Sequence, residues 1–440
     1  MTLKYVASTE AGQGLSLAFS ALILMAVLAI AIGSLSSLKN PTETRKTVKR
    51  QIHEADESDE PEEGASSELV SLKDAYLFPV FGSLALYGPF IATTEWDRTI
   101  INYALTAYFG IMGVLATAQV GVIILTAVIT LFGIKLDYWH IRLIRTSHAS
   151  SYGHPAFVNE YLKANLPKLN TEFYTARFSV VHLFMLPVSA MLSAYYVGTK
   201  NWVASNILAF SFALSAVQMF TLESFKAGVV LMSGMFAYDV YWSNKPEILN
   251  VVLKNFDLPI KIVFPRLLLG LPAGQAFKFV SLGLGDIVVP GLFAALCLRF
   301  DQQRAGVRNP ELGRSTQFRK PYFIGCIVAY ILGLGSMFAI HHITRVTLPA
   351  LLFLTPACVL SVFMSAAVRG ELQHVFQYIS EEGVIAAKEK ARALERKTRQ
   401  KVQLMAKKSP RVSRLPNVIK EEAFVPASRS GAQENMEDSS

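Results

Sequence analysis

Charged residues are scarce in this chain of 440 residues: Asp, Glu, Lys and Arg together make up 17%, while hydrophobic residues make up 52%. Soluble globular chains carry about 25% charged residues, so this composition excludes a protein that folds entirely in water. The apolar residues gather in runs of roughly 20, the length that crosses a hydrocarbon core about 30 Å thick. We therefore expect an all-α membrane protein that crosses the bilayer several times.

Cysteine and histidine are also scarce, with three and eight residues respectively. Cys297, Cys326 and Cys358 lie inside apolar runs and form no CxxC pair, which favours small buried side chains over a disulfide or a metal site. The histidines form no HExxH pattern, the signature of a zinc protease. We therefore expect neither a metal ion nor another cofactor.

The net charge of +9 could indicate a nucleic-acid partner. Most of the excess Lys and Arg, however, lies beside the apolar runs and in the C-terminal tail. That distribution follows the positive-inside rule and suits an anionic cytosolic leaflet better than a groove for DNA. Membrane lipids are the expected partners of this charge, and nucleic acid is not.

Nine apolar runs predict nine membrane spans. The third run is too long for one perpendicular crossing, but no polar turn divides it in two, so it counts as one span that tilts strongly or extends past the bilayer. The first run has more basic residues after it than before it, which is the reverse of a secretory signal and predicts an uncleaved span with the N-terminus outside. The predicted spans are 15–35, 75–93, 101–133, 177–197, 203–221, 227–243, 275–299, 321–341 and 347–368.

With nine spans the C-terminus lies in the cytosol, and the connections test this topology. The two connections 134–176 and 300–320 would be cytosolic, and each carries five basic residues, as the positive-inside rule requires. The polar segment 39–73 would be cytosolic too, and the seven acids within 54–63 predict a disordered loop.

The chain divides into three predicted regions. Residues 1–200 form an N-terminal region of four spans, residues 201–371 form a second membrane region of five spans, and residues 372–440 form a cytosolic tail. Ala, Lys, Glu and Arg dominate 381–408, which predicts a helix that is solvated, lies on the membrane surface or binds a partner. Beyond Pro410 the composition predicts disorder.

Two aspartates, Asp239 and Asp286, lie near the middle of consecutive apolar runs, where an ionisable side chain is costly and needs a function. If the two carboxyl groups face each other, they cannot both ionise cheaply and would share a proton. Aspartic proteases use such a pair to activate water and polarise a peptide carbonyl. A lone buried aspartate more often marks an ion path, so a proton- or cation-conducting transporter is the competing hypothesis.

The neighbours of these aspartates fit a site that admits a peptide. Gly283 and Gly285 lack side chains and allow another backbone to approach. Pro290 lies four residues after Asp286 and removes the N–H that would bond its carbonyl in a helix. Tyr238 can donate a hydrogen bond, although its position next to Asp239 turns it partly away.

Three short motifs follow one another in the chain: Tyr238-Asp239, then Gly283-Leu284-Gly285-Asp286, then Pro349-Ala350-Leu351. By itself the last motif is an ordinary helix start with proline in the first turn. In this order, the three motifs resemble those of the GxGD intramembrane aspartyl proteases, which include presenilins and signal peptide peptidases.

The sequence around the motifs, at 236–242, 256–265, 282–291 and 349–358, resembles the signal peptide peptidase branch. The likeness is strong from about 201 to 371. Two positions depart from the family pattern. Leu348 stands where the family usually has glutamine before Pro-Ala-Leu, and Ser243-Asn244 follow Trp242 where apolar residues are common.

The resemblance implies a presenilin-like bundle of nine helices in the endoplasmic reticulum membrane, with a lumenal N-terminus and a cytosolic C-terminus. It implies that Asp239 and Asp286 are catalytic and that the remaining motif residues support the site or bind substrate. Those supporting residues are Tyr238, Gly283, Leu284, Gly285, Pro349, Ala350 and Leu351.

The implied substrates are remnant signal peptides and type II transmembrane segments, which the enzyme would hydrolyse within the membrane. Candidate partners are a second copy of the chain and the degradation machinery of the endoplasmic reticulum. A protein that only escorts membrane clients would keep the motifs without catalysis, and it stands as an alternative beside the transporter.

Overall fold

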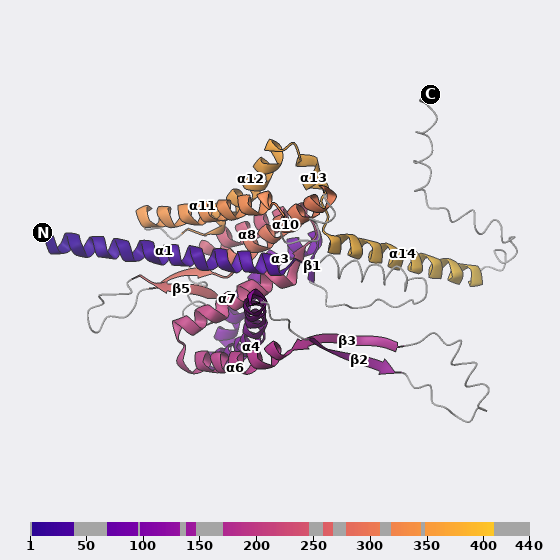
Figure 1. Cartoon of the computed structure of the whole chain (residues 1–440), viewed down its shortest axis with the longest axis horizontal. Coiled ribbons are helices and arrows are strands. Elements are labelled where there is room, and N and C mark those ends of the chain that lie inside the picture. The colour runs from indigo at the N-terminus through magenta and orange to yellow at the C-terminus, as the bar shows by residue number, and fades with distance from the viewer. Residues whose placement is uncertain are drawn as a thin grey trace. The chain divides into compact units, whose positions relative to one another are not determined.

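The computed structural model describes residues 2–38, 68–95, 97–132, 138–146, 170–245, 258–266, 279–308, 318–344 and 348–408. It divides into two compact units, Met1–Gly383 and Val384–Ser440. The first unit holds the short strands and all the helices labelled in Figure 1 except α14, most of which belongs to the second unit. The acidic block and the chain beyond 408 lie outside the described residues, so their predicted disorder stays a prediction.

The predicted multi-pass helical class is confirmed. Among the described residues, seven helices are long and apolar enough to cross a membrane, and α8 and α10, which carry the two aspartates, are not among them. The count of nine spans therefore stays a prediction. The helices that overlap the predicted spans are α1 (Thr2–Ser36), α3 (Leu72–Glu95), α4 (Arg98–Leu131), α6 (Val180–Thr199), α7 (Trp202–Met219), α8 (Phe225–Ser243), α10 (Gly285–Arg308), α11 (Pro321–Thr344) and α12 (Leu351–Val368).

Short strand pairs, which the sequence analysis did not predict, join parts of the first unit. β1 (Glu68–Val70) pairs in parallel with β4 (Phe220–Leu222), and β2 (Tyr138–Thr146) pairs antiparallel with β3 (Asn170–Ser179). The third pair is antiparallel and consists of β5 (Lys261–Pro265) and β6 (Phe279–Gly283).

Two predicted spans therefore begin too early. The span predicted at 275–299 opens as strand β6, and its helix starts only at Gly285. The span predicted at 177–197 likewise opens with the end of β3, and α6 starts at Val180. An apolar run does not distinguish a buried strand from a helix, and the glycines at 283 and 285 are weak helix formers.

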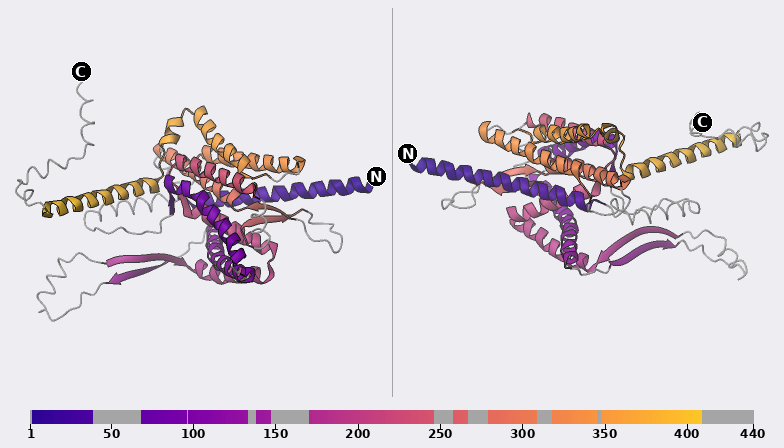
Figure 2. Two further views of the ribbon diagram at one scale, coloured as in Figure 1. Left: turned by 180° about the vertical axis from the view of Figure 1, so that it is seen from behind. Right: turned by 45° about the horizontal axis from the view of Figure 1, so that its top comes forward.

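Helix α10 forms the centre of the first unit (Figure 1). It contacts α1, α7, α8, α11 and α12, and every residue from Val289 to Phe300 is buried. Figure 2 shows α1 beside α11 from two further directions, and these two helices also contact each other. A helix that is apolar on all sides is typical of such a surrounded position.

Helices α11 and α12 pack closely at Gly333. A Cβ atom built on Gly333 would lie 3.2 Å from the Phe353 carbonyl oxygen and 3.3 Å from the Ala357 Cβ. Small residues at such crossings let helix backbones approach, which is the main source of helix association inside a membrane. A Cβ atom added to Gly335, two residues further along α11, would meet no atom within 4 Å, so this position faces open space.

We expect Gly333→Val to lower the thermal unfolding midpoint of the detergent-solubilised protein. Overpacking a close contact costs about 1–3 kcal/mol, and here the contact is a backbone carbonyl that cannot rotate away. Gly335→Val is the matched control, because it places the same side chain on the same helix without a clash. Equal midpoint shifts for the two variants would contradict the close packing of α11 on α12.

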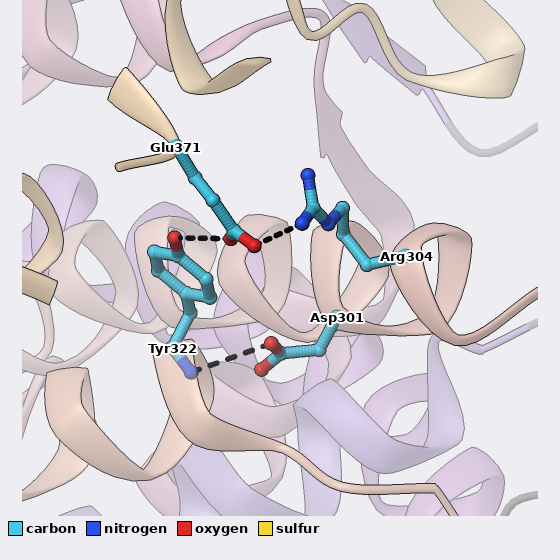
Figure 3. Close-up of polar contacts among 4 residues, drawn as sticks. All are labelled: Asp301, Arg304, Tyr322 and Glu371. Carbon is cyan, nitrogen blue, oxygen red and sulfur yellow. Dashed lines mark hydrogen bonds and ion pairs between the residues drawn. The ribbon is translucent and has the colours of Figure 1, made fainter. Parts of the chain in front are cut away.

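A polar network links α10, α11 and the chain that follows α12 (Figure 3). Glu371 forms an ion pair with Arg304 and accepts a hydrogen bond from the Tyr322 hydroxyl at 2.8 Å. The Asp301 carboxylate accepts from the backbone N–H groups of Tyr322 at 3.4 Å and Phe323 at 2.9 Å. Asp301 thereby satisfies N–H groups that the start of α11 leaves without helical partners.

The segment after α12 continues through α13 (Leu372–Gln377) into α14 (Glu381–Lys408). The helix predicted over 381–408 is therefore present as α14. The boundary between the two compact units falls inside its first turn, after Gly383.

Candidate active site

Asp239 lies on α8 and meets the start of α12. Its Oδ2 accepts a hydrogen bond from the backbone N–H of Leu351 at 3.4 Å. The N–H groups of a first helical turn have no intrahelical partner, and Ala350 at the N-cap offers no side-chain hydrogen bond. No side chain of the Pro349-Ala350-Leu351 motif bonds the Leu351 N–H at the start of α12, and the Asp239 carboxyl group accepts this hydrogen bond instead.

Asp286 lies at the other side of the site, in the first turn of α10. The sequence analysis placed it near the middle of a span, but it is the second residue of its helix, because β6 occupies the preceding residues. The Gly283 N–H donates a hydrogen bond to the Asp286 carboxyl group, and a Cβ built on Gly283 would lie 3.1 Å from Asp286 Oδ2. The first glycine of the motif therefore makes room for the aspartate itself.

The other two residues of this motif differ in their surroundings. Leu284 donates its backbone N–H to the Ile260 carbonyl at 3.0 Å, which extends the β5–β6 pairing up to the start of α10. Gly285 has no atom within 4 Å of an added Cβ, so the space beside Asp286 on that side is open. Gly283 thus leaves room for the Asp286 carboxyl group, and Gly285 leaves open space beside it.

The two carboxyl groups come within electrostatic interaction range of each other. Helix α8 contacts both α10 and α12, which explains how three motifs distant in the sequence meet. Two carboxyl groups in such a position can share one proton, so that one acts as a base while the other acts as an acid. The arrangement can activate a water molecule and polarise a carbonyl.

The Tyr238 hydroxyl lies outside this pair. It donates to the Gly82 carbonyl of α3 at 3.3 Å, and the neighbouring Trp242 Nε1 donates to Ser83 Oγ at 3.2 Å. Gly234 on α8 also faces α3, with only 2.9 Å between an added Cβ and Pro79 Cγ. Tyr238 thus fixes α8, the helix that carries Asp239, against α3.

Asn206 on α7 is a residue that the sequence analysis missed. Its Oδ1 accepts from the Val263 N–H at 2.8 Å, and its Nδ2 donates to the Val263 carbonyl at 2.7 Å. One side chain thereby satisfies both outward-facing backbone groups in the middle of β5. The only available signal in the sequence was an amide inside an apolar run, which requires a buried partner but does not name it.

The β5–β6 pair consequently has two different edges. The outer edge of β5 is covered at Val263 by Asn206, whereas the outer edge of β6 has no partner strand among the described residues. Val263 lies opposite Ser281, so the backbone groups of Ser281 point away from β5 on that second edge. The open edge ends at Gly283, three residues before Asp286.

Comparison with known proteins assigns this site to a family. The profile described as signal peptide peptidase matches residues 62–382, a range that contains all three motifs. The chain belongs to the signal peptide peptidase family. The family match ends one residue before the boundary of the first compact unit at Gly383.

Individual relatives agree with this assignment. The chain is 31% identical over 381 residues to "Signal peptide peptidase" of Mus musculus and to that of Homo sapiens, covering 83% of this chain and 84% of each relative. It is 34% identical over 206 residues to "Intramembrane protease 2" of Caenorhabditis elegans, covering 46% of this chain and 43% of that protein. The chain is thus an intramembrane aspartic protease, and the transporter and escort hypotheses are not favoured.

Proposed function

We propose that Asp239 and Asp286 are the catalytic dyad of this signal peptide peptidase family member. The observation that carries the proposal is the meeting of three motifs: Asp239 caps the helix that Pro349-Ala350-Leu351 opens, within electrostatic range of Asp286. Among the described residues, no group of three or more His, Cys, Asp or Glu side chains is arranged to hold a metal ion. In the proposed mechanism the two carboxyl groups supply the acid and the base.

Hydrolysis follows from one shared proton. The ionised carboxylate takes a proton from a water molecule, and the oxygen of that water adds to the scissile carbonyl carbon. The protonated partner donates a hydrogen bond to the carbonyl oxygen. The tetrahedral intermediate then collapses, the C–N bond breaks, and the leaving nitrogen takes a proton from a carboxyl group. A new carboxyl and a new amino terminus leave, the dyad keeps one proton, and no covalent bond joins enzyme and substrate.

The open edge of β6 fits an extended substrate. A helical membrane segment has its backbone groups occupied by its own hydrogen bonds, so its peptide bond is shielded until it unwinds. An unwound segment can add to the free edge of a sheet, where main-chain hydrogen bonds hold it without regard to its side chains. Because that edge ends at Gly283, a strand bound there leads the peptide toward Asp286.

We expect Asn206→Ala to reduce peptide cleavage about ten-fold, because β5 loses its anchor and two buried backbone groups lose their partners at a cost of about 1–3 kcal/mol. Cleavage is measured with a purified transmembrane peptide substrate and the midpoint of thermal unfolding is followed in parallel.

The matched control for this change is Asn201→Ala on the same helix. Asn201 caps α7 by accepting from the Val203 N–H at 2.8 Å, so its loss costs about 1 kcal/mol of stability. Cleavage by Asn201→Ala is expected to stay near the level of the wild type. Equal losses of cleavage in both variants would show that stability, and not the β5–β6 pair, explains the effect.

We further propose that the substrates are signal peptides and type II membrane segments, cleaved in the endoplasmic reticulum membrane. The mouse and human relatives named signal peptide peptidase support the substrate class. The basic connections 134–176 and 300–320 support a cytosolic C-terminus and, with nine spans, a lumenal N-terminus. Helical segments of the opposite orientation would meet the dyad with their chain direction reversed.

The test is reconstitution of the purified protein in liposomes with one substrate presented in either orientation. Mass spectrometry of the products is expected to show cleavage within the apolar segment of the type II form and little cleavage of the reversed form. Proton or cation flux without peptide products would instead establish the transporter. Protease protection of tags at the two termini checks the topology, and a protected C-terminal tag would overturn it.

A further inference from the structure

The backbone carbonyl of Asp286 needs a hydrogen-bond donor from outside its own helix. In a regular helix it would accept from the N–H of residue 290, and that residue is Pro290, which has none. The residues that follow Pro290 are all buried up to Phe300, so the interior of the first unit surrounds this part of α10. A buried carbonyl without a donor costs free energy, and such groups are rare in folded proteins.

Tyr330 on α11 supplies the missing donor. Its hydroxyl donates to the Asp286 carbonyl oxygen at 3.3 Å, although the two residues lie 44 positions apart in the chain. The Tyr330 side chain is 1% exposed and belongs to the main hydrophobic core of the first unit. Its ring is therefore held by packing, and the hydroxyl projects from a rigid support.

We propose that Tyr330 is a positioning residue for Asp286: its hydroxyl replaces the donor that Pro290 removes and holds the first turn of α10 in the orientation that catalysis needs. This inference rests on the proposed dyad. At this one carbonyl, the first turn of α10 accepts its hydrogen bond from α11 instead of from its own next turn. Because α11 packs tightly on α12 at Gly333, the attachment also relates Asp286 to the helix that Asp239 caps.

Loss of the Tyr330 hydroxyl is expected to slow the chemical step and to leave substrate binding unchanged. Asp286 and its turn shift when the anchor is lost, and catalytic groups tolerate little displacement. The open edge of β6 keeps its pairing with β5, so the affinity for an extended substrate is unchanged. The hydrogen bond is long for an O–H donor, so we expect a loss of about ten-fold in kcat with KM unchanged for Tyr330→Phe.

The test is a double-mutant cycle between Tyr330→Phe and Pro290→Ala, measured as kcat and KM for a type II transmembrane peptide. Pro290→Ala restores a backbone N–H four residues after Asp286, so the hydroxyl becomes redundant. In that background, Tyr330→Phe is expected to lower kcat less than about two-fold. Equal losses of kcat in both backgrounds would overturn the proposal, as would a wild-type kcat for Tyr330→Phe alone.

Tyr322→Phe is the matched control. Tyr322 is also on α11 and is 2% exposed, but its hydroxyl donates to Glu371 and not to the catalytic helix turn. Its loss is expected to lower the unfolding midpoint while kcat stays near the wild-type value. A fall in kcat equal to that of Tyr330→Phe would overturn the positioning role and leave a general effect of destabilising α11.

A separate variant, Asp286→Asn, distinguishes failure of this inference from failure of the proposed dyad. If Asp286→Asn remains active, the dyad is wrong and the positioning of Asp286 has no catalytic meaning. If Asp286→Asn is inactive and Tyr330→Phe has a normal kcat, the dyad stands and only the role of Tyr330 fails.

Discussion

Replacing Asp286 with asparagine is expected to abolish peptide cleavage, with a loss of about 10³-fold or more in kcat. The amide has nearly the same shape as the carboxyl group and can still accept the hydrogen bond from Gly283 N–H, so the first turn of α10 keeps its geometry. What the amide lacks is the ability to exchange a proton with water or with the substrate. Asp239→Asn is expected to fail in the same way while it still caps Leu351.

The losses of kcat caused by Asp239→Asn and Asp286→Asn are not expected to add. In the proposed mechanism the carboxyl groups work as one unit with one shared proton, so removing the second after the first removes nothing further. The double variant Asp239→Asn/Asp286→Asn should therefore be about as inactive as either single variant. Product formation is measured under single-turnover conditions, so that slow product release does not conceal the chemical step.

Asp301→Asn is the matched control for these variants. Asp301 is 3% exposed and lies on the same helix as Asp286, but it caps α11 and takes no part in the site. The amide keeps one of the two oxygens that accept from the start of α11, so some stability is lost, but cleavage is expected to stay within about three-fold of the wild type. Robust cleavage by Asp286→Asn would contradict the dyad, and loss of cleavage in all three variants would indicate a fold that tolerates no buried amide.

The second large effect is expected at Gly283. We expect Gly283→Val to lower kcat about 100-fold, because its Cβ would lie 3.1 Å from Asp286 Oδ2 and would push the carboxyl group aside. Valine favours a strand, and Gly283 ends β6, so the change should not cost stability by itself. We therefore expect a large fall in kcat and little change in the unfolding midpoint.

Gly285→Ala provides the comparison for Gly283. A Cβ at this position meets no atom within 4 Å, so Asp286 is not displaced. The added methyl group instead occupies the open approach beside the aspartate, and we expect KM to rise while kcat stays within about three-fold of the wild type. Equal falls in kcat at the two glycines would contradict the distinction drawn between them.

Much of the helical fold could be predicted from the sequence because apolar length is a strong and local signal. Every predicted span overlaps one helix, and the two aspartates stood out because a carboxyl group inside an apolar run is costly. The strands escaped prediction because β6 is as apolar as the helices beside it. The start of α10 at Gly285 therefore became clear only when β5 was seen to pair with the preceding residues.

The contacts of the site depend on packing between distant segments, which a single sequence does not contain. Nothing near Tyr238 in the chain indicates that its hydroxyl bonds to Gly82 on α3. Likewise, Asn206 was visible as a polar residue in an apolar run, but the strand that it anchors follows more than 50 residues later. The sequence predicted the candidate reacting groups, whereas the contacts that support them became visible only in the structure.

The Pro349-Ala350-Leu351 motif gains a physical meaning from the fold. Proline and alanine bring no side-chain hydrogen bond to the helix start, so the Leu351 N–H is free to bond Asp239. The departure at Leu348 precedes this start and does not alter the N–H that Asp239 receives. The family's usual glutamine is thus absent here without a change in the capping of α12.

The chain that follows the last apolar run is part of the folded unit. Ser380 N–H donates to the Glu223 carbonyl at 2.8 Å, and Ile379 forms a β-bridge with Ser224 at the start of α8. Val375 is fully buried in the main core. This segment therefore fastens the beginning of the helix that carries Asp239.

The contacts of the segment after α12 bear on where translation can stop without damage to the folded unit. A premature termination codon just after Val368 would spare both aspartates and all seven helices of the described residues that are long and apolar enough to cross a membrane. That product would nevertheless lack the bridge to Ser224 and the ion pair of Glu371 with Arg304. We therefore expect a working enzyme to need the chain at least as far as Gly383, about fifteen codons past the end of α12.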